Sequence, residues 1–314
     1  MNMKVQEILD EIKKVIIGKD EKIARVLMAL LAEGHILIED VPGVGKTTLA
    51  LAFSKALGLD YNRTQFTPDV VPSDIVGFSM YNKESGQFEY RQGAAFCNLF
   101  LADEINRTSS KTQSALLEVM EEGQATIDGV SHELPKPFVV IATQNPVGTA
   151  GTQPLPSAQL DRFLVKMEMG YPDIESQIEI LRDRQKENPI NGVKAVVTGE
   201  EILAMQQEVR QVYAADEILS YTTRLAAATR ENLMITLGVS PRGAIAVLRM
   251  AKAYAYITGR DYVVPEDVSA VFKDVCTHRI LLNSKAKISD KTAVDVLQEV
   301  LDQVVIEAGL WEKK

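Results

Sequence analysis

A glycine-rich stretch near residue 40 has almost the spacing of a phosphate-binding loop. Residues 40–47 read D-V-P-G-V-G-K-T, which fits G-x-x-x-x-G-K-[ST] except that Asp40 replaces the first glycine. An apolar run precedes the loop and a helical pattern follows it, so backbone N–H groups and a helix N-terminus would face an anion. A plain Pro-Gly turn is the alternative, but a lysine at the positive end of a helix dipole favours a counter-anion. The sequence therefore predicts a nucleotide site.

Two residues of this loop have side chains suited to a nucleotide and its metal. Lys46 would contact the β- and γ-phosphates as a point charge, and the Thr47 hydroxyl would ligate Mg²⁺. The residues expected to bind the nucleotide here are Val41, Pro42, Gly43, Val44, Gly45, Lys46, Thr47 and Thr48.

Two carboxylates follow a second apolar run. The run 99–102 is followed by Asp103 and Glu104. An acidic pair at a strand end is usually only a solvated edge, but after a phosphate loop it fits the Walker B motif. Asp103 would then bind Mg²⁺ through water, and Glu104 would polarise the attacking water.

Three further polar residues lie at expected element ends. Asn145 follows the next apolar run and could orient the lytic water or contact the γ-phosphate, although Asn before Pro is also a plain turn former. Arg242 would lie in the first turn of a helix capped by Ser240, where a cation is unfavourable unless a phosphate lies nearby. Arg162 would stand between a helix and a strand, and its alternative role is an ion pair with Asp161 or another acid.

Apolar runs and helical patterns alternate over the first 170 residues. Runs suited to strands buried on both faces are 36–39, 99–102, 138–142 and 163–167. Helices are expected over 47–57 and 110–120. This alternation predicts an α/β fold in which helices cover a parallel sheet.

The rest of the chain departs from this alternation. Residues 78–90 and 124–134 are typical of β-hairpins, each inserted ahead of a core strand. After residue 170 the pattern is helical, with segments at 174–186, 200–213, 218–230, 240–257, 265–280 and 290–308. We therefore expect an α/β nucleotide-binding core over 1–170 and an α-helical domain over 171–314.

Composition narrows the classes of function. The net charge of −9 argues against a protein that coats nucleic acid without sequence preference. No apolar run approaches the roughly 20 residues needed to cross a bilayer, and the N-terminus has no apolar secretory segment, so we expect a cytoplasmic location. A zinc site is not expected, because the cysteines and histidines are scattered. They are Cys97, Cys276, His35, His132 and His278, and the two cysteines are expected to be buried free thiols.

Together these motifs make the chain resemble the AAA+ ATPases and, among them, the MoxR family. The resemblance covers nearly the full length. It rests on V-I-I-G-K at 15–19, L-I-E-D-V-P-G-V-G-K-T at 37–47, L-A-D-E-I-N-R at 101–107, A-T-Q-N-P at 142–146, L-P-S-A-Q-L-D-R-F at 155–163 and S-P-R at 240–242. It implies a P-loop NTPase core with helices on both faces of the sheet and a C-terminal α-helical lid.

The resemblance also implies roles for single residues. Asn145 would be the sensor-1 residue, Arg162 the arginine finger that reaches a neighbour's nucleotide, and Arg242 the sensor-2 residue of the lid. The adenine pocket would be lined by Val15, Ile16, Ile17 and Gly18. The two hairpins match the helix-2 insert and the pre-sensor-1 hairpin of the clade that includes magnesium chelatase.

The activity implied by the resemblance is ATP hydrolysis with Mg²⁺. Members assemble into rings, generally hexamers, and act as chaperone-like machines that mature partner complexes or insert cofactors into them. Their partners often include von Willebrand factor A domain proteins, and this chain has no D-x-S-x-S motif, so such a domain would lie on another chain. The alternatives are a nucleotide-gated scaffold with little turnover and a motor stimulated by nucleic acid, which the acidic charge disfavours.

Small departures from the family pattern remain. Ser157 stands where an acidic residue is common, and R-Q-G at 91–93 replaces R-P-G. Asp40 is a familiar family variant, and its carboxylate can point away from a nucleotide because the phosphate-facing amides come later in the loop. We therefore expect Asp40→Gly to change ATP affinity modestly, whereas Lys46→Ala should abolish tight binding or turnover.

Overall fold

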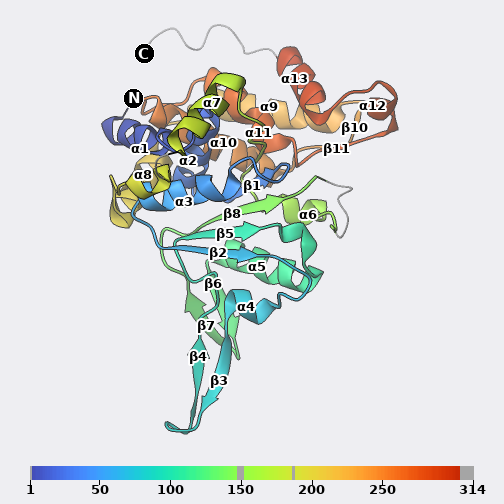
Figure 1. Cartoon of the computed structure of the whole chain (residues 1–314). Helices are drawn as coiled ribbons and strands as arrows, with labels where there is room; N and C mark the ends of the chain where they lie inside the picture. Colours follow the sequence, from blue (N-terminus) through green and yellow to red (C-terminus); the bar gives the residue numbers. More distant parts are fainter. Residues whose placement is uncertain (1, 147–151, 186–187, 305–314) are drawn as a thin grey trace.

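The centre of the protein is a five-stranded parallel sheet with the strand order β2-β5-β8-β1-β9 (Figure 1). The computed structural model describes residues 2–146, 152–185 and 188–304. The strands are β1 (Ile36–Glu39), β2 (Tyr61–Gln65), β5 (Leu99–Asp103), β8 (Val139–Gln144) and β9 (Val165–Met167). Both β5 and β8 are buried along their whole length, as their apolar sequences predict. The predicted parallel sheet is confirmed.

Helices cover both faces of the sheet because the strand side chains alternate between two apolar clusters. One face packs against α1 (Met3–Lys13), α2 (Asp20–Leu31) and α3 (Lys46–Ala56), and the other against α4 (Pro72–Val76) and α5 (Ser110–Glu122). On β5, for example, Leu99 and Leu101 belong to the first cluster, and Phe100 belongs to the second. The α/β core predicted from the sequence is therefore correct, although α1, α2, α4 and β2 were not predicted as elements.

The helix ends that frame the site follow local sequence signals. Gly45 adopts a left-handed conformation at the start of α3, which only glycine adopts without strain. The Ser109 side chain accepts a hydrogen bond from Thr112 N at the start of α5, and Gly123 ends that helix in the left-handed region. Strand β1 precedes α3 and strand β5 precedes α5. Because the sheet is parallel, the carboxyl ends of both strands lie at the same edge.

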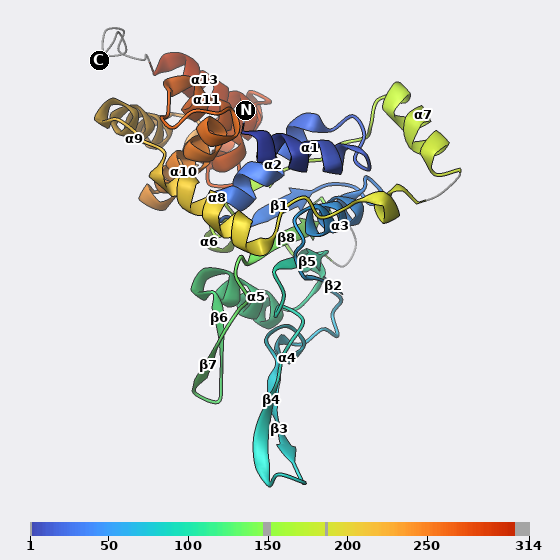
Figure 2. The ribbon, with the colours of Figure 1, turned by 90° about the vertical axis from the view of Figure 1, so that its left-hand side faces the viewer.

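Two hairpins extend from the core at the same end of the molecule (Figures 1 and 2). They are β3 (Phe78–Asn82) with β4 (Gln87–Arg91), and β6 (Gln124–Ile127) with β7 (Val130–Glu133). The rings of Tyr90 and His132 stack with centroids 3.7 Å apart and so join the two hairpins. Both predicted insertions are confirmed.

The chain beyond residue 170 is mainly helical, as expected. The helices are α7 (Ile174–Asp183), α8 (Gly199–Gln211), α9 (Asp216–Glu231), α10 (Pro241–Ile257), α11 (Pro265–Cys276), α12 (Ser284–Ile288) and α13 (Ala293–Gln303). The helix expected over 290–308 forms over Ala293–Gln303, and positions 305–308 lie outside the described residues. A small antiparallel pair, β10 (Ile235–Leu237) with β11 (Leu281–Leu282), was not predicted.

Helix α7 stands apart from the other C-terminal helices. Figure 2 shows it on the opposite side of α1 and α2 from α9, α11 and α13. The division of the chain at residue 170 stays a prediction. Over the ranges 2–146, 152–185 and 188–304, no helix combines the length and the apolar character that a membrane span requires.

Candidate functional site

The glycine-rich loop opens into a pocket of about 670 Å³, which is within the usual range for small-molecule sites. Gly43 and Gly45 have φ angles of 89° and 94°, which glycine adopts without strain. A Cβ placed on either glycine would meet no described atom within 4 Å, so the loop backbone faces open space rather than packed side chains. Exposed backbone beside a helix N-terminus is suited to binding an anion.

This pocket is lined by most of the residues that the sequence predicts to bind the nucleotide. They are Val15, Ile16, Ile17, Pro42, Gly43, Val44, Gly45, Lys46, Thr47, Thr48, Asp103, Glu104 and Asn145. Strand tips β1, β5 and β8 and the start of α3 bring them together, although the residues are spread over 130 positions of the chain.

Two predicted binding residues lie just behind the pocket instead. The backbone oxygen of Val41 accepts a hydrogen bond from Lys46 Nζ at 3.3 Å, so Val41 supports the lysine. Gly18 has a φ of 70° and packs closely against α7, where a Cβ would overlap the Ser176 side chain. Glycine is therefore needed at position 18 for the approach of α7.

Lys46 is held by backbone oxygens at the entrance of the loop. Its side chain is buried, and Nζ donates to Asp40 O at 2.6 Å. Burial lowers the pKa of Lys46, and the nearby carboxylates of Asp40, Asp103 and Glu104 oppose that shift. This arrangement places the positive charge of Lys46 at the pocket of the glycine-rich loop.

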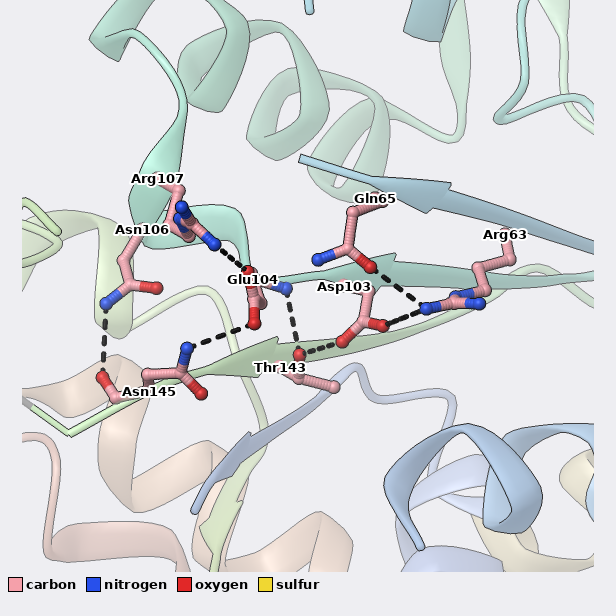
Figure 3. A network of polar contacts seen from close by, with 8 residues as sticks. All are labelled: Arg63, Gln65, Asp103, Glu104, Asn106, Arg107, Thr143 and Asn145. Carbon is pink, nitrogen blue, oxygen red and sulfur yellow. Dashed lines mark hydrogen bonds and ion pairs between the residues drawn. The ribbon is translucent and has the colours of Figure 1, made fainter. Parts of the chain in front are cut away.

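The carboxylate of Asp103 is fixed on both sides (Figure 3). Thr143 Oγ1 donates to Asp103 Oδ1 at 2.5 Å, and Arg63 Nη2 donates to Asp103 Oδ2 at 2.8 Å. Thr143 Oγ1 also accepts from Glu104 N at 2.9 Å, which joins β8 to the tip of β5. Thr143 and Arg63 therefore hold the β5 carboxylate toward the pocket.

Glu104 has an unusual backbone conformation for a residue other than glycine. Its φ is 58° and its ψ is 48°, and strain of this kind clusters at functional sites. Figure 3 shows the side chain between Arg107, which donates to Oε2 at 2.8 Å, and Asn145, which donates to Oε1 at 3.1 Å. Burial by itself would raise the pKa of Glu104, but the hydrogen bonds from Arg107 and Asn145 outweigh it and lower the pKa. Glu104 is therefore ionised at neutral pH.

Asn145 is held by its backbone and leaves one side-chain atom available. Asn106 Nδ2 donates to Asn145 O at 3.1 Å, which fixes the chain after β8. Asn145 Oδ1 is buried and has no hydrogen-bond partner among the described residues. A buried polar atom without a partner is costly unless a ligand or water satisfies it.

The residues at the pocket fit a nucleotide with a magnesium ion. The hydroxyl of Thr47 and the carboxylate of Asp103 line the same pocket, and oxygen donors of these types are the ones that Mg²⁺ takes together with phosphate oxygens and water. The apolar residues Ile16, Ile17 and Ile180 line it as well, which suits an aromatic base.

The Asp40 carboxylate binds the first loop amide and the segment after β9, and not the later amides of the loop, which are the ones expected to face phosphate. Oδ2 accepts from Met169 N at 2.8 Å and from Gly170 N at 2.6 Å, and Oδ1 accepts from Val41 N at 2.7 Å. In the part of the chain that the structure describes, Asp40 is not among the pocket-lining residues. The expectation that the carboxylate points away from the nucleotide agrees with this geometry.

Arg162 and Arg242 lie elsewhere. Arg162 Nε is 3.2 Å from one carboxylate oxygen of Glu121, and Arg242 Nη1 is 3.1 Å from the other. Together with Arg249 and Arg279 they line a second pocket of about 220 Å³, and within the described ranges neither lines the pocket of the glycine-rich loop.

The local settings of these two arginines follow the sequence only in part. Arg242 lies in the first turn of α10, where Ser240 caps the helix as expected by accepting from Gly243 N. Arg162 pairs with another acid, Glu121, which was one of the two alternatives from the sequence, whereas Asp161 pairs with Arg279 at 2.7 Å.

Several pocket residues were not predicted. Arg63 and Gln65 alternate on β2 and so face the same side, but a polar edge strand gives only a weak signal in the sequence. The others come mainly from the segment after β9 and from α7: Lys19, Met169, Tyr171, Pro172, Gln177, Ile180, Leu181, Asp183, Arg184 and Pro189. No pattern in the sequence indicates that α7 folds back over this pocket.

Comparison with known proteins agrees with this geometry. Residues 35–165 match the family model described as "ATPase family associated with various cellular activities (AAA)", and residues 227–300 match the AAA lid domain. The structure resembles that of a Cytophaga hutchinsonii protein described provisionally as an ATPase, with a TM-score of 0.90 and 41% identity over 96% of this chain and 94% of that chain.

Two relatives match over most of their length. The chain is 46% identical to the uncharacterized protein YeaC of Bacillus subtilis (strain 168) over 95% of this chain and 93% of the relative. It is 38% identical to Chaperone MoxR1 of Mycobacterium tuberculosis (strain ATCC 25618 / H37Rv) over 94% of this chain and 80% of the relative. With a pocket built from the loop after β1 and the tips of β5 and β8, this chain belongs to the MoxR family of AAA+ ATPases.

Proposed function

We propose that the protein binds ATP with Mg²⁺ and hydrolyses it to ADP and phosphate. One observation carries this proposal: Lys46, Asp103, Glu104 and Asn145 line a single pocket together with the glycine-rich loop. These side chains meet the needs of phosphoryl transfer, which are positive charge on the phosphates, a metal ligand and a group that orients water.

Each residue has a distinct task in the proposed reaction. Lys46 and the loop amides hold the β- and γ-phosphates, and bound Mg²⁺ would neutralise part of their charge through Thr47 and Asp103. The Glu104 carboxylate accepts a proton from water as the water oxygen bonds to the γ-phosphorus and the bond to the β–γ bridging oxygen breaks. Asn145 orients Glu104 through the hydrogen bond to Oε1.

Arg162 and Arg242 act, in this proposal, on the nucleotide of a neighbouring subunit. Two arginines share the single acid Glu121, so one carboxylate balances two cations and a phosphate could replace it. Their pocket is separate from the pocket of the same chain's own loop. A closed ring, which we propose to be hexameric, would bring the two pockets of adjacent subunits together.

The work done by hydrolysis is proposed to be remodelling, assembly or cofactor insertion of partner protein complexes in the cytoplasm. The name of the relative Chaperone MoxR1 supports a chaperone-like role, and the net charge of −9 disfavours nucleic acid as the partner. A von Willebrand factor A domain protein and a client complex would bind in trans.

Glu104→Gln separates binding from turnover. The amide keeps the size of the side chain but cannot accept the proton, so we expect ATP affinity within about threefold of the wild type and a loss of turnover of at least about 100-fold. Lys46→Ala should lose tight ATP binding. Isothermal titration calorimetry and phosphate release measure the two quantities.

Three results would contradict this proposal. Normal hydrolysis by Glu104→Gln would show that another group activates water. Tight ATP binding by the wild type without phosphate release, with or without partner proteins, would favour a nucleotide-gated scaffold. Strong stimulation by DNA would favour a nucleic-acid motor.

A further inference from the structure

Asp40 connects the phosphate loop to the segment that follows β9. Its Oδ2 accepts hydrogen bonds from two successive amides, Met169 N at 2.8 Å and Gly170 N at 2.6 Å. Gly170 has a φ of 66°, and successive N–H groups beside a left-handed residue form a concavity that binds anions. The side chain that replaces the first loop glycine therefore fills a backbone anion site more than 120 residues away in the chain.

The other contacts of Asp40 lie on the loop side of this connection. Oδ1 accepts from Val41 N at 2.7 Å, and the backbone oxygen accepts from Lys46 Nζ at 2.6 Å. The backbone N of Asp40 donates to Gln144 O at 3.2 Å, which attaches the residue to β8. Asp40 is thus fixed to the sheet on one side and holds the segment after β9 on the other.

The segment held by Asp40 leads directly into the far wall of the nucleotide pocket. Met169, Tyr171 and Pro172 line the pocket, and α7 follows with Ile180 and Leu181. A second tie holds the same segment, because Lys19 Nζ donates to Tyr171 O at 2.7 Å. Lys19 lies close in sequence to Ile16 and Ile17, which also line the pocket. The contacts of Asp40 and of Lys19 therefore hold residues 169–171 at the apolar side of the pocket.

We propose that Asp40 is a positioning residue that fixes the base-side wall of the pocket, made of residues 169–172 and α7, relative to the phosphate loop. This inference rests on the proposed binding of ATP. Asp40 then strengthens the binding of the nucleoside part of ATP, whereas Lys46 and the loop amides bind the phosphates. The carboxylate at this loop position takes over a role that a glycine cannot provide.

Asp40→Asn tests the inference with little change in size. Both carboxylate oxygens of Asp40 accept hydrogen bonds, Oδ1 from one backbone N–H and Oδ2 from two. In asparagine one of these oxygens is replaced by an NH₂ group, which cannot accept a hydrogen bond from a backbone N–H. We expect the dissociation constant of ATP to rise about fivefold, because charge-assisted hydrogen bonds in the wall are lost. The dissociation constant of inorganic tripolyphosphate, which has no nucleoside, should rise less than about twofold. Calorimetric titration of the full-length protein with Mg²⁺ measures both ligands.

Hydrogen exchange provides a second readout. Asp40→Asn should speed exchange at the amides of 169–170 and in α7, and ATP should protect those amides less than in the wild type. Asp128→Asn is the matched control, because Asp128 lies exposed in the turn of the β6–β7 hairpin and has a φ of 52° that asparagine tolerates. This control should leave both dissociation constants unchanged.

The outcomes separate this inference from the proposed function. Equal weakening of ATP and tripolyphosphate in Asp40→Asn would show that Asp40 acts only on the phosphate loop, and unchanged ATP binding would show that it positions nothing. Either result overturns the inference and leaves ATP binding intact. Failure of the wild type to bind either ligand would instead overturn the proposed function.

Discussion

Arg63 Nη2 lies 2.8 Å from Asp103 Oδ2, so the edge strand β2 supplies a cation to the carboxylate that is expected to bind Mg²⁺. Arg63 also donates to Gln65 Oε1 at 2.9 Å and is about half exposed. The Arg63 guanidinium and a bound Mg²⁺ ion would compete for the negative charge of the Asp103 carboxylate. We therefore expect the pair to affect how much Mg²⁺ the protein needs when it binds a nucleotide.

Arg63→Gln should lower the Mg²⁺ concentration at half-maximal nucleotide binding. The expected change is about threefold, since a partly exposed ion pair contributes little more than ~1 kcal/mol. Titration of a fluorescent ATP analogue against Mg²⁺ measures it. Arg91→Gln, which removes a hairpin arginine near Glu89, is the control. A higher Mg²⁺ requirement in Arg63→Gln would mean that Arg63 assists metal binding.

Mixing two inactive variants tests whether Arg162 acts on a neighbour. The Lys46→Ala variant keeps Arg162 but cannot bind ATP tightly at its own pocket. The Arg162→Ala variant keeps its ATP pocket but lacks the arginine. If Arg162 acts in trans, mixed rings should recover activity, at about one quarter of the sites for a random equal mixture. Phosphate release by the mixture and by each variant alone gives the comparison. No recovery would place Arg162 at its own chain's nucleotide.

Arg242 can be examined in the same way. Arg242 and Arg162 form ion pairs with the same acid, Glu121, so we expect both arginines to act at the same neighbouring site. We expect Arg242→Ala mixed with Lys46→Ala to recover activity as Arg162→Ala does. Recovery for Arg162 alone would show that the two arginines serve different nucleotides.

Arg279 should contribute strongly to stability, because it joins α11 to the residues around Arg162. Its side chain is 3% exposed and donates to Asp161 Oδ1 at 2.7 Å, Phe163 O at 2.7 Å and Leu164 O at 3.0 Å. Arg279→Met should lower the free energy of unfolding by about 3–5 kcal/mol, because it leaves a half-buried carboxylate and buried carbonyls without partners. Urea unfolding measures the loss, and a loss below about 1 kcal/mol would contradict the assigned contacts.

The sequence was sufficient to predict which residues meet at the centre of the candidate site, because its signals are local. The loop before α3 and the acidic pair after β5 are each specified within about ten residues. Parallel strands bring their carboxyl ends to one edge, so the meeting of Lys46, Glu104 and Asn145 follows from the fold class. The buried cysteines at 97 and 276 also agree with their apolar surroundings.

The rest could not be predicted because it depends on long-range packing. β2 reads Y-N-R-T-Q, and its polar side chains give no strand signal, so Arg63 was missed. Helix α7 lines the pocket of the glycine-rich loop, and its Ser176 packs so closely against Gly18, far away in the chain, that a Cβ at position 18 would overlap it. The sharing of Glu121 by Arg162 and Arg242 joins three separate elements, and no spacing rule describes it.

His35 should make the stability of the protein depend on pH. Its ring accepts a hydrogen bond from Val140 N at Nδ1, and Nε2 lies 2.9 Å from Met120 O, so the imidazole is buried and neutral. Burial, with a smaller contribution from the charge of Arg249, lowers the pKa of His35 from its usual value of 6.5 to about 4, although the contact with Met120 O opposes this shift. Below pH 6.5 the His35 ring is therefore protonated in the unfolded chain but stays neutral in the folded chain until the pH approaches 4. This contribution to stability is complete above pH 6.5 and is lost as the pH falls toward 4.

The expected loss from His35 alone is about 2 kcal/mol between pH 7 and pH 5. Urea unfolding of the wild type and of His35→Gln at both pH values isolates it, because all other titrating groups are common to the two proteins. The wild type should lose more stability than the variant by this amount, and an NMR titration should find the His35 ring neutral at pH 5. Equal losses in the two proteins would show that His35 is charged in the folded state.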